Sequence, residues 1–144
     1  MPDHTFQPGE LSDLESWDFL RNQELGRLAF HLLGEVHIVP INYAVDDQRL
    51  LFRTAEGSKL LGITMNDDVA FEVDEVVGEE ATSVIVRGSA HVLEGSDAYV
   101  ADTVRLRPWL EGAKFNVVAI DVTEITGRRA HLHRPWVGMQ HVDG

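Results

Sequence analysis

The sequence contains no cysteine and no long apolar run. Without cysteine the protein has neither a disulfide framework nor a thiolate metal or redox site. No stretch approaches the ~20 consecutive apolar residues that a membrane-spanning helix needs. The first residues also lack the basic and then apolar build of a signal peptide. We therefore expect a cytoplasmic protein with no membrane partner.

Positive charge is scarce as well. Twelve Lys and Arg stand against 24 Asp and Glu, which gives a net charge of −12, and only Lys59 and Lys114 are lysines. A protein that binds nucleic acid needs clustered Lys and Arg facing the phosphates, so we expect no nucleic-acid partner. Recognition of a single phosphate depends on local rather than net charge. The positions of the few cations are therefore informative.

The length of 144 residues and the 44% share of hydrophobic residues are those of one ordinary globular domain. We take residues 1–144 as this domain. Residues 1–10, with two prolines and a glycine, are expected to form an irregular arm, and residues 131–144 a polar tail.

Alternating apolar and polar residues between turn signals predict a mostly β protein. Six strands are expected, at residues 26–33, 36–45, 49–54, 69–74, 83–93 and 115–125. Three short helices are expected at residues 12–23, 58–66 and 99–106. Hairpin spacing between most strands favours a small antiparallel barrel with helices at its ends.

Several residues set the boundaries of these elements. Ser12 and Glu15 fit a capping box, and Leu14, Trp17 and Leu20 form the apolar stripe that follows. Gly34-Glu35 is predicted to be the first hairpin turn. Pro40 restricts its strand to a sheet edge or a bulge, Gly88 marks a bulge or a close approach, and Gly127 is expected to end the last strand.

One short stretch of this acidic chain concentrates groups that bind phosphate. Arg53 lies at the end of a predicted strand with Thr54, and a turn leads to Ser58 and Lys59 at a helix start, all within seven residues. Backbone N–H groups at a helix start and adjacent cationic side chains suit a phosphate monoester. The same residues also fit a solvated strand end and an ordinary helix cap.

A series of short motifs in a fixed order gives the sequence a recognisable family pattern. They are LGRLA (25–29), VPINY (39–43), FRT (52–54), GSKL (57–60), VAFEVD (69–74), SVIVRGSA (83–90), RPW (107–109) and ITGRR (125–129). In these motifs the chain resembles the FMN-binding split-barrel proteins related to pyridoxamine 5′-phosphate oxidase, and among them the nitroimidazole-reductase-like group. The resemblance implies a six-stranded antiparallel split β-barrel with short flanking helices.

The resemblance also implies a homodimer with two FMN sites at the subunit interface. It assigns the phosphate to Arg53, Thr54, Ser58 and Lys59, and the border of the isoalloxazine ring to Val39, Pro40, Ile41 and Asn42. Trp109 and Arg128 are the candidates for completing the site from the second subunit. The chain departs from the group at Thr82, where its members often carry an aromatic residue, and this leaves the substrate open.

The function expected on this basis is that of an FMN-dependent oxidoreductase acting on a small molecule, with no catalytic residue assigned. Two alternatives remain open: a non-catalytic module of the same fold that stores or senses a flavin or haem, and a reductase that uses a deazaflavin.

Other ionisable groups do not form a convincing site in the sequence. His131 and His133 share a strand face, but a metal site needs three or four converging ligands, so no metal is expected. Acidic residues from Glu72 to Glu80 are expected to be a solvated edge, with Arg87 as the partner of Glu72.

Overall fold

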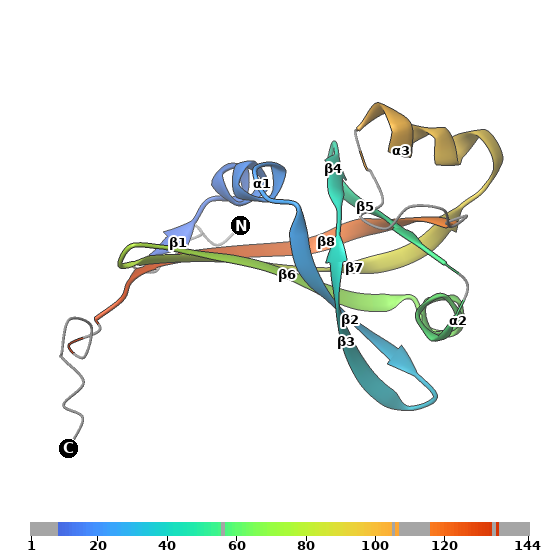
Figure 1. Cartoon of the computed structure of the whole chain (residues 1–144), viewed down its shortest axis with the longest axis horizontal. Helices are drawn as coiled ribbons and strands as arrows, with labels where there is room; N and C mark the ends of the chain where they lie inside the picture. The colour runs from blue at the N-terminus through green and yellow to red at the C-terminus, as the bar shows by residue number, and fades with distance from the viewer. Residues whose placement is uncertain (1–8, 56, 105, 107–115, 134, 136–144) are drawn as a thin grey trace, which may run out of the picture.

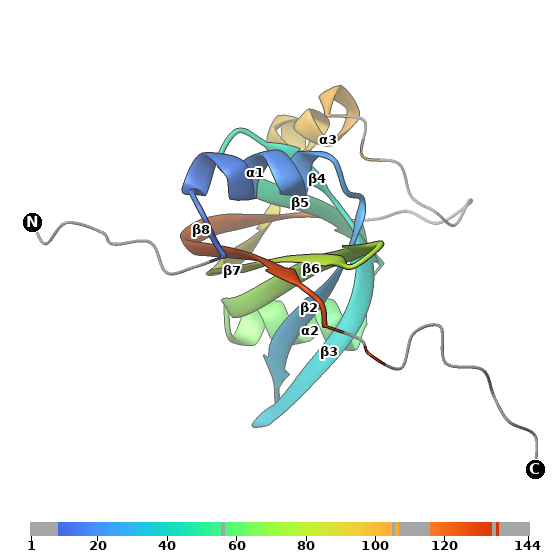
Figure 2. The same cartoon turned by 90° about the vertical axis from the view of Figure 1, so that its left-hand side faces the viewer.

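The computed structural model of the chain describes residues 9–55, 57–104, 106, 116–133 and 135. One antiparallel sheet curls into a half-barrel, and three short helices lie around it (Figures 1 and 2). In Figure 2 the helices α1 and α2 lie on opposite sides of the sheet. None of the helices in the described ranges is long and apolar enough to span a membrane.

The elements follow one another in a simple order. They are β1 (Glu10–Leu11), α1 (Asp13–Arg21), β2 (Leu25–Leu32), β3 (Glu35–Asn42), β4 (Ala44–Asp46), β5 (Arg49–Thr54), α2 (Ser58–Met65), β6 (Asp68–Val77), β7 (Glu80–Leu93), a 3₁₀ turn (Gly95–Tyr99), α3 (Val100–Thr103) and β8 (Asn116–His131).

The sheet order explains both the curl and the strand count. Neighbouring strands follow the order β3-β2-β6-β7-β8-β5-β4, and β1 pairs with β8. The strands β3 and β4 are consecutive in the chain but lie at opposite ends of this order, so the sheet has to curl. The expected strand at 36–45 therefore divides at Tyr43, and with β1 the described chain has eight strands where six were predicted. The prediction of a mostly β, split-barrel-like fold is confirmed.

Alternation along the strands builds the main core. Side chains of β2, β6 and β7 that point into the curl are almost fully buried, among them Leu28, Phe71, Val73, Val84 and Val86. The strand β5 is covered on both faces. Its Leu50 and Phe52 join the main core, whereas Leu51 packs in a second cluster with Leu93, Ala101 and Leu106. This second cluster attaches the α3 segment to the sheet.

The predicted capping box of α1 is present, but one residue of the predicted apolar stripe is not buried. The backbone N–H of Ser12 donates to Glu15 Oε1 at 3.0 Å, and the N–H of Glu15 donates to Ser12 Oγ at 3.1 Å. Trp17 and Leu20 are buried, whereas Leu14 is 81% exposed. At ~100° per residue Leu14 lies about 60° from Trp17 and about 120° from Leu20 around the helix, so it falls at the edge of the buried face.

Two turn predictions were wrong in position or role. The first hairpin turns at Leu33-Gly34, with φ angles of 52° and 81°, instead of at Gly34-Glu35. Positive φ at both central residues is the geometry that matches the twist of the flanking strands. Gly127 does not end its strand, because β8 continues to His131. A Cβ at Gly127 would lie 2.3 Å from Ser16 Oγ, so this glycine makes room for α1.

The remaining boundary predictions had mixed outcomes. Pro40 lies on β3, which is an end strand, and pairs in regular register with Arg27, so the edge prediction holds without a bulge there. The helix expected at 99–106 is shorter: a 3₁₀ turn leads into one turn of α3, which ends at Thr103.

Gly88 lies at a bulge, as predicted. The pairing of β7 with β8 shifts register between Arg87 and Gly88, and a Cβ at Gly88 would lie 2.2 Å from the carbonyl oxygen of Asp121. The obstacle is backbone, which cannot move aside as a flexible side chain can. The tight approach of the two strands therefore requires glycine.

We predict that Gly88→Ala lowers the free energy of unfolding by roughly 1–3 kcal/mol, because the added methyl group overpacks the strand pair. Chemical denaturation measures the change. The control is Arg87→Ala at the neighbouring exposed position, expected within about 0.5 kcal/mol of the parent. Equal stability of the two variants would contradict the close approach.

Candidate functional site

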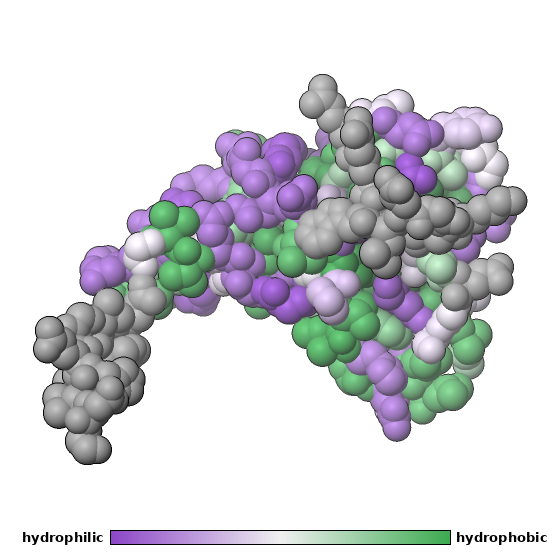
Figure 3. Space-filling model, viewed as in Figure 1, coloured by the Kyte–Doolittle hydropathy of each residue, from purple (hydrophilic) through white to green (hydrophobic). Residues whose placement is uncertain are grey.

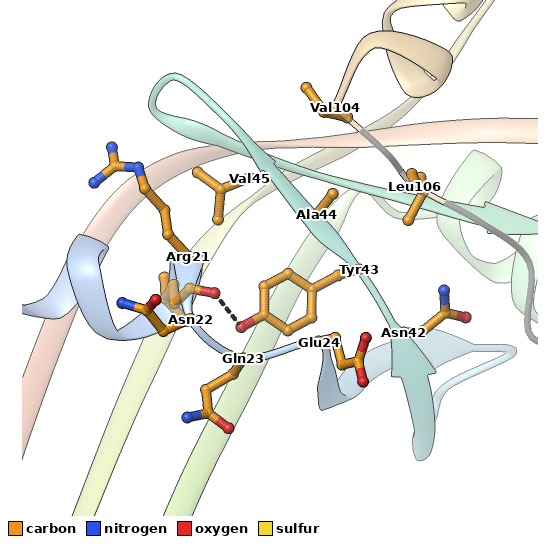
Figure 4. Close-up of a pocket in the computed structure, with 11 residues that line it drawn as sticks. Arg21, Asn22, Gln23, Glu24, Asn42, Tyr43, Ala44, Val45, Val104 and Leu106 are labelled. Carbon is orange, nitrogen blue, oxygen red and sulfur yellow. Dashed lines mark hydrogen bonds between the residues drawn. The ribbon is translucent and has the colours of Figure 1, made fainter.

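A pocket lies where α1 ends and the chain passes from β3 to β4 (Figure 4). Its volume is about 670 Å³, within the range usual for small-molecule sites. It is lined by Leu20, Arg21, Asn22, Gln23, Glu24, Asn42, Tyr43, Ala44, Val45, Val104 and Leu106. The pocket thus joins the β3–β4 passage to the segment that follows α3.

Tyr43 holds one wall of this pocket in place. Its hydroxyl donates to the carbonyl oxygen of Leu20 at 2.6 Å (Figure 4). Its backbone N–H donates to the carbonyl oxygen of Glu24 at 3.0 Å. Burial raises the pKa of Tyr43 above its ordinary value, so the phenol stays neutral. The residue acts as a structural brace between α1 and the sheet.

Arg53 does not line this pocket but contacts Leu106, which does, and its guanidinium already has partners. Its Nε donates to the carbonyl oxygen of Leu106 at 3.1 Å, and its Nη2 lies 2.9 Å from Oδ1 of Asp102. The side chain of Arg53 is 22% exposed, whereas that of Asp102 is 72% exposed. One edge of Arg53 is therefore held by the α3 segment.

The other predicted phosphate residues lie at the end of β5 and the start of α2. Thr54 is buried, and its hydroxyl donates to the carbonyl oxygen of Ala55 at 3.2 Å. Ser58 is exposed and begins α2, whose N-cap Gly57 has a φ of 154° and provides no side-chain cap. The first N–H groups of α2 therefore lack a side-chain acceptor from the N-cap.

Among the described cations that have no ion pair, Lys59 is the half-buried one, since Arg87 and Arg128 are exposed. Its side chain is half-buried, and desolvation lowers its pKa below the ordinary value. No carboxylate pairs with it in the part of the chain that the structure describes. Partial burial of an ammonium group is unfavourable unless an anion compensates it.

Of the four residues predicted to border the flavin ring, only Asn42 lines the pocket. On β3, Ile41 is buried and Val39 packs against the core, whereas Pro40 is exposed on the opposite face. Because β3 ends the sheet, one backbone edge of this strand is not paired with another described strand.

Arg128 lies far from Arg53 within one chain. Arg53 pairs with Val117 on β8, and Arg128 is eleven residues further along that strand, roughly 35 Å away at ~3.3 Å per residue. It is exposed. Any contact of Arg128 with a ligand at Arg53 would therefore have to come from a second copy of the chain. Trp109 lies outside the described residues.

Sequence reasoning missed most of the pocket wall. Residues 21–24 at the end of α1 and Leu106 beyond α3 carry no motif, and only the tertiary fold brings them together. Asp102 was missed for the same reason, since it lies 49 residues from its partner Arg53.

Thr82 belongs to a second, smaller pocket of about 390 Å³ between α1, the β6–β7 hairpin and β8. Its hydroxyl accepts a hydrogen bond from Nε of Arg129 at 3.2 Å. The position where the family often has an aromatic residue therefore does not line the larger pocket.

Several of the other ionisable residues form pairs. His131 lies 3.3 Å from a carboxylate oxygen of Glu79, and no group of three or more side chains in the described segments could hold a metal. Glu72 pairs with Arg27 at 2.6 Å, so the predicted pairing with Arg87 was wrong: Ala70 is the register partner of Arg87.

Comparison with known proteins gives consistent results. The family model described as pyridoxamine 5′-phosphate oxidase matches residues 12–129. A FAD-binding protein of Mycobacterium smegmatis is 40% identical, with 86% of this chain and 99% of that chain covered and a TM-score of 0.75. A FAD-binding protein of Mesorhizobium loti is 26% identical, with 84% and 96% covered and a TM-score of 0.74.

A third structure shares the fold at lower identity. It is a Bacteroides thetaiotaomicron protein named for 5-nitroimidazole antibiotic resistance, 15% identical, with 83% of this chain and 86% of that chain covered and a TM-score of 0.70. These neighbours agree with the resemblance found in the sequence motifs.

We predict that Tyr43→Phe lowers the free energy of unfolding by about 0.5–1.5 kcal/mol, because it removes one buried hydrogen bond to the carbonyl of Leu20, which also accepts from the N–H of Gln23. Since the unfolded state ionises first, the parent should also lose stability as the pH rises above 10.0, and the variant should lack this loss. Denaturation at several pH values measures both. Tyr99→Phe, at a 70% exposed position, is the control and should change neither.

Proposed function

Because the chain belongs to the pyridoxamine 5′-phosphate oxidase family, we propose that it binds a flavin nucleotide, FMN, and acts as a flavin-dependent oxidoreductase on a small molecule. The phosphate would lie at the end of β5 and the start of α2. The isoalloxazine ring would lie along residues 39–42 of β3, at the side of the pocket lined by Asn42.

The residues present suit the phosphate of such a ligand. Arg53 and Lys59 supply positive charge, Ser58 supplies a hydroxyl, and the uncapped start of α2 supplies backbone N–H groups. Charge-assisted hydrogen bonds and a helix N-terminus are what a phosphate monoester requires. Thr54 is buried and already donates its hydroxyl hydrogen, so it would support the turn.

The observation that carries the proposal is the state of Lys59. Its ammonium is half-buried, has a lowered pKa and pairs with no carboxylate among the described residues, in a chain of net charge −12. Although the chain is rich in carboxylates, none of the described ones pairs with this half-buried ammonium, which favours an external anion as its partner.

When bound, the flavin would supply the hydride and electron transfer, so the protein needs no acid or base of its own for that step. The chain would contribute binding and orientation. Tyr43 fixes the passage from β3 to β4, and backbone groups of β3 would face the ring edge. Two similar structures are those of FAD-binding proteins, so the mass of the released ligand has to distinguish FMN from FAD.

The test is to identify the ligand and then to localise its phosphate. The protein purified from its own host is analysed by visible absorption and by the mass of what heat releases, with flavin bands expected. A sharp violet band would instead indicate haem, and a deazaflavin would be identified by its mass. Activity is then assayed with a nicotinamide donor and small-molecule acceptors; absence of turnover would favour the storage or sensing alternative.

We predict that Lys59→Ala and Arg53→Ala each raise the Kd for FMN by about tenfold or more, because each removes a charge-assisted hydrogen bond. Titration calorimetry measures the change. Riboflavin has the same ring without the phosphate, and its affinity should not change. Arg49→Ala removes the same charge from the same strand and serves as the control. Unchanged FMN affinity in the double variant Arg53→Ala/Lys59→Ala would refute the phosphate site.

We also infer that the protein is a homodimer with its flavin sites at the interface. Large apolar side chains are exposed along the β2–β3 hairpin and α2, namely Leu33, Val36, Ile38, Leu61 and Met65. Figure 3 shows apolar side chains gathered at this end of the molecule, at the lower right. A surface of this kind marks an interaction site. The distance of Arg128 from Arg53 within one chain agrees with a role in the other subunit.

We predict that the parent has twice the 16.1 kDa mass of one chain in light scattering after size exclusion, and that Ile38→Glu shifts it toward the monomer. A buried, unpaired carboxylate would oppose association. Leu14→Glu introduces the same charge at an exposed apolar residue on α1 and should leave the mass unchanged. A monomeric parent protein would contradict the dimer.

A further inference from the structure

Arg53 makes its two polar contacts within the described chain to residues of one segment, that of α3. Its Nη2 lies 2.9 Å from Oδ1 of Asp102, and its Nε donates to the carbonyl oxygen of Leu106 at 3.1 Å. Leu106 is buried in the second core cluster, which fixes the carbonyl, whereas the carboxylate of Asp102 is 72% exposed. The fixed contact orients the guanidinium, and the exposed one only neutralises it.

We propose that Asp102 is an internal anion that competes with the flavin phosphate for Arg53 and so weakens the binding of phosphate-bearing ligands. This inference rests on the proposed function. It makes Asp102 a residue that sets cofactor affinity and discriminates between cofactors, although it would not itself contact the flavin.

The competition follows from charge and exposure. A carboxylate and a phosphate near one guanidinium repel each other. The bound phosphate therefore either displaces the Asp102 carboxylate or binds beside it with a lower affinity. Displacement is feasible because the carboxylate is largely in water, where an ion pair is weak. The hydrogen bond from Nε to Leu106 would persist and keep Arg53 in place.

The effect should depend on the charge of the ligand's phosphate. FMN ends in a monoester that carries up to two negative charges on one phosphorus. FAD carries its two phosphates as a diester chain with one charge each. Riboflavin carries none. Asp102 therefore lowers the affinity for FMN most, that for FAD less, and that for riboflavin not at all.

Asp102→Asn removes the charge and keeps an oxygen that can accept from Nη2, so the packing of α3 should be preserved. We expect the Kd for FMN to fall by about two- to fivefold, with a smaller change for FAD and none for riboflavin. Titration calorimetry measures the three ligands, and thermal unfolding checks that the variant is folded.

Two further variants isolate the contact. Asp97→Asn removes the same charge from the preceding 3₁₀ turn, where the side chain is exposed and makes no contact with Arg53, and should leave all three affinities unchanged. In the Arg53→Ala background, Asp102→Asn should no longer change the Kd for FMN, because the guanidinium for which carboxylate and phosphate compete is absent.

The outcomes separate this inference from the proposed function. If Arg53→Ala weakens FMN binding but Asp102→Asn leaves it unchanged or weakens it, then Asp102 orients Arg53 instead of competing, and the inference is overturned while the phosphate site stands. If Asp97→Asn matches Asp102→Asn, the effect is one of net charge, and the inference fails. If the parent protein binds no flavin, the proposed function itself fails.

Discussion

The half-barrel depends on the passage of the chain through Tyr43. The strand β3 pairs with β2 at one end of the sheet and β4 pairs with β5 at the other, yet a single residue separates β3 from β4. The two ends of the sheet must therefore come together at Tyr43. Its backbone N–H and its hydroxyl are both bound to carbonyl groups of residues 20–24. The contacts that close the sheet thus also form the wall of the larger pocket.

Patterns of neighbouring residues predicted correctly those features of the fold that depend on neighbouring residues alone. The capping box at Ser12 and the alternating strands β6 and β7 need only neighbouring residues or a period of two. Gly88 was identified as a bulge or close approach because a glycine inside an alternating strand weakens it and is usually kept for one of these two purposes. Gly127 shows what such local patterns cannot predict. It was read as a strand end, whereas it makes room for Ser16, a residue 111 positions away that no local pattern could reveal.

The residues predicted to bind phosphate are continuous in the chain, whereas the partners of Arg53 are not. Arg53, Ser58 and Lys59 lie within seven residues, so a strand, a turn and a helix start suffice to bring them near one another. Asp102 and Leu106 reach Arg53 through the second core cluster, where Ala101 and Leu106 pack on Leu51 and Leu93. Because both faces of β5 are buried, the α3 segment packs on this strand and brings Asp102 to Arg53. The pattern of apolar residues in β5 alone does not predict this contact.

The two cations of the candidate site differ in the state in which the fold leaves them. The charge of Arg53 is compensated within the chain by Asp102. The charge of Lys59 is partly desolvated, which lowers its pKa, and no carboxylate in the described ranges compensates it. An incoming phosphate would restore at Lys59 the stabilisation that burial removes, whereas at Arg53 it would replace an existing partner. Lys59 would therefore contribute most of the electrostatic affinity for a phosphate, and the pair of Arg53 and Asp102 would determine how strongly that affinity depends on the charge of the ligand.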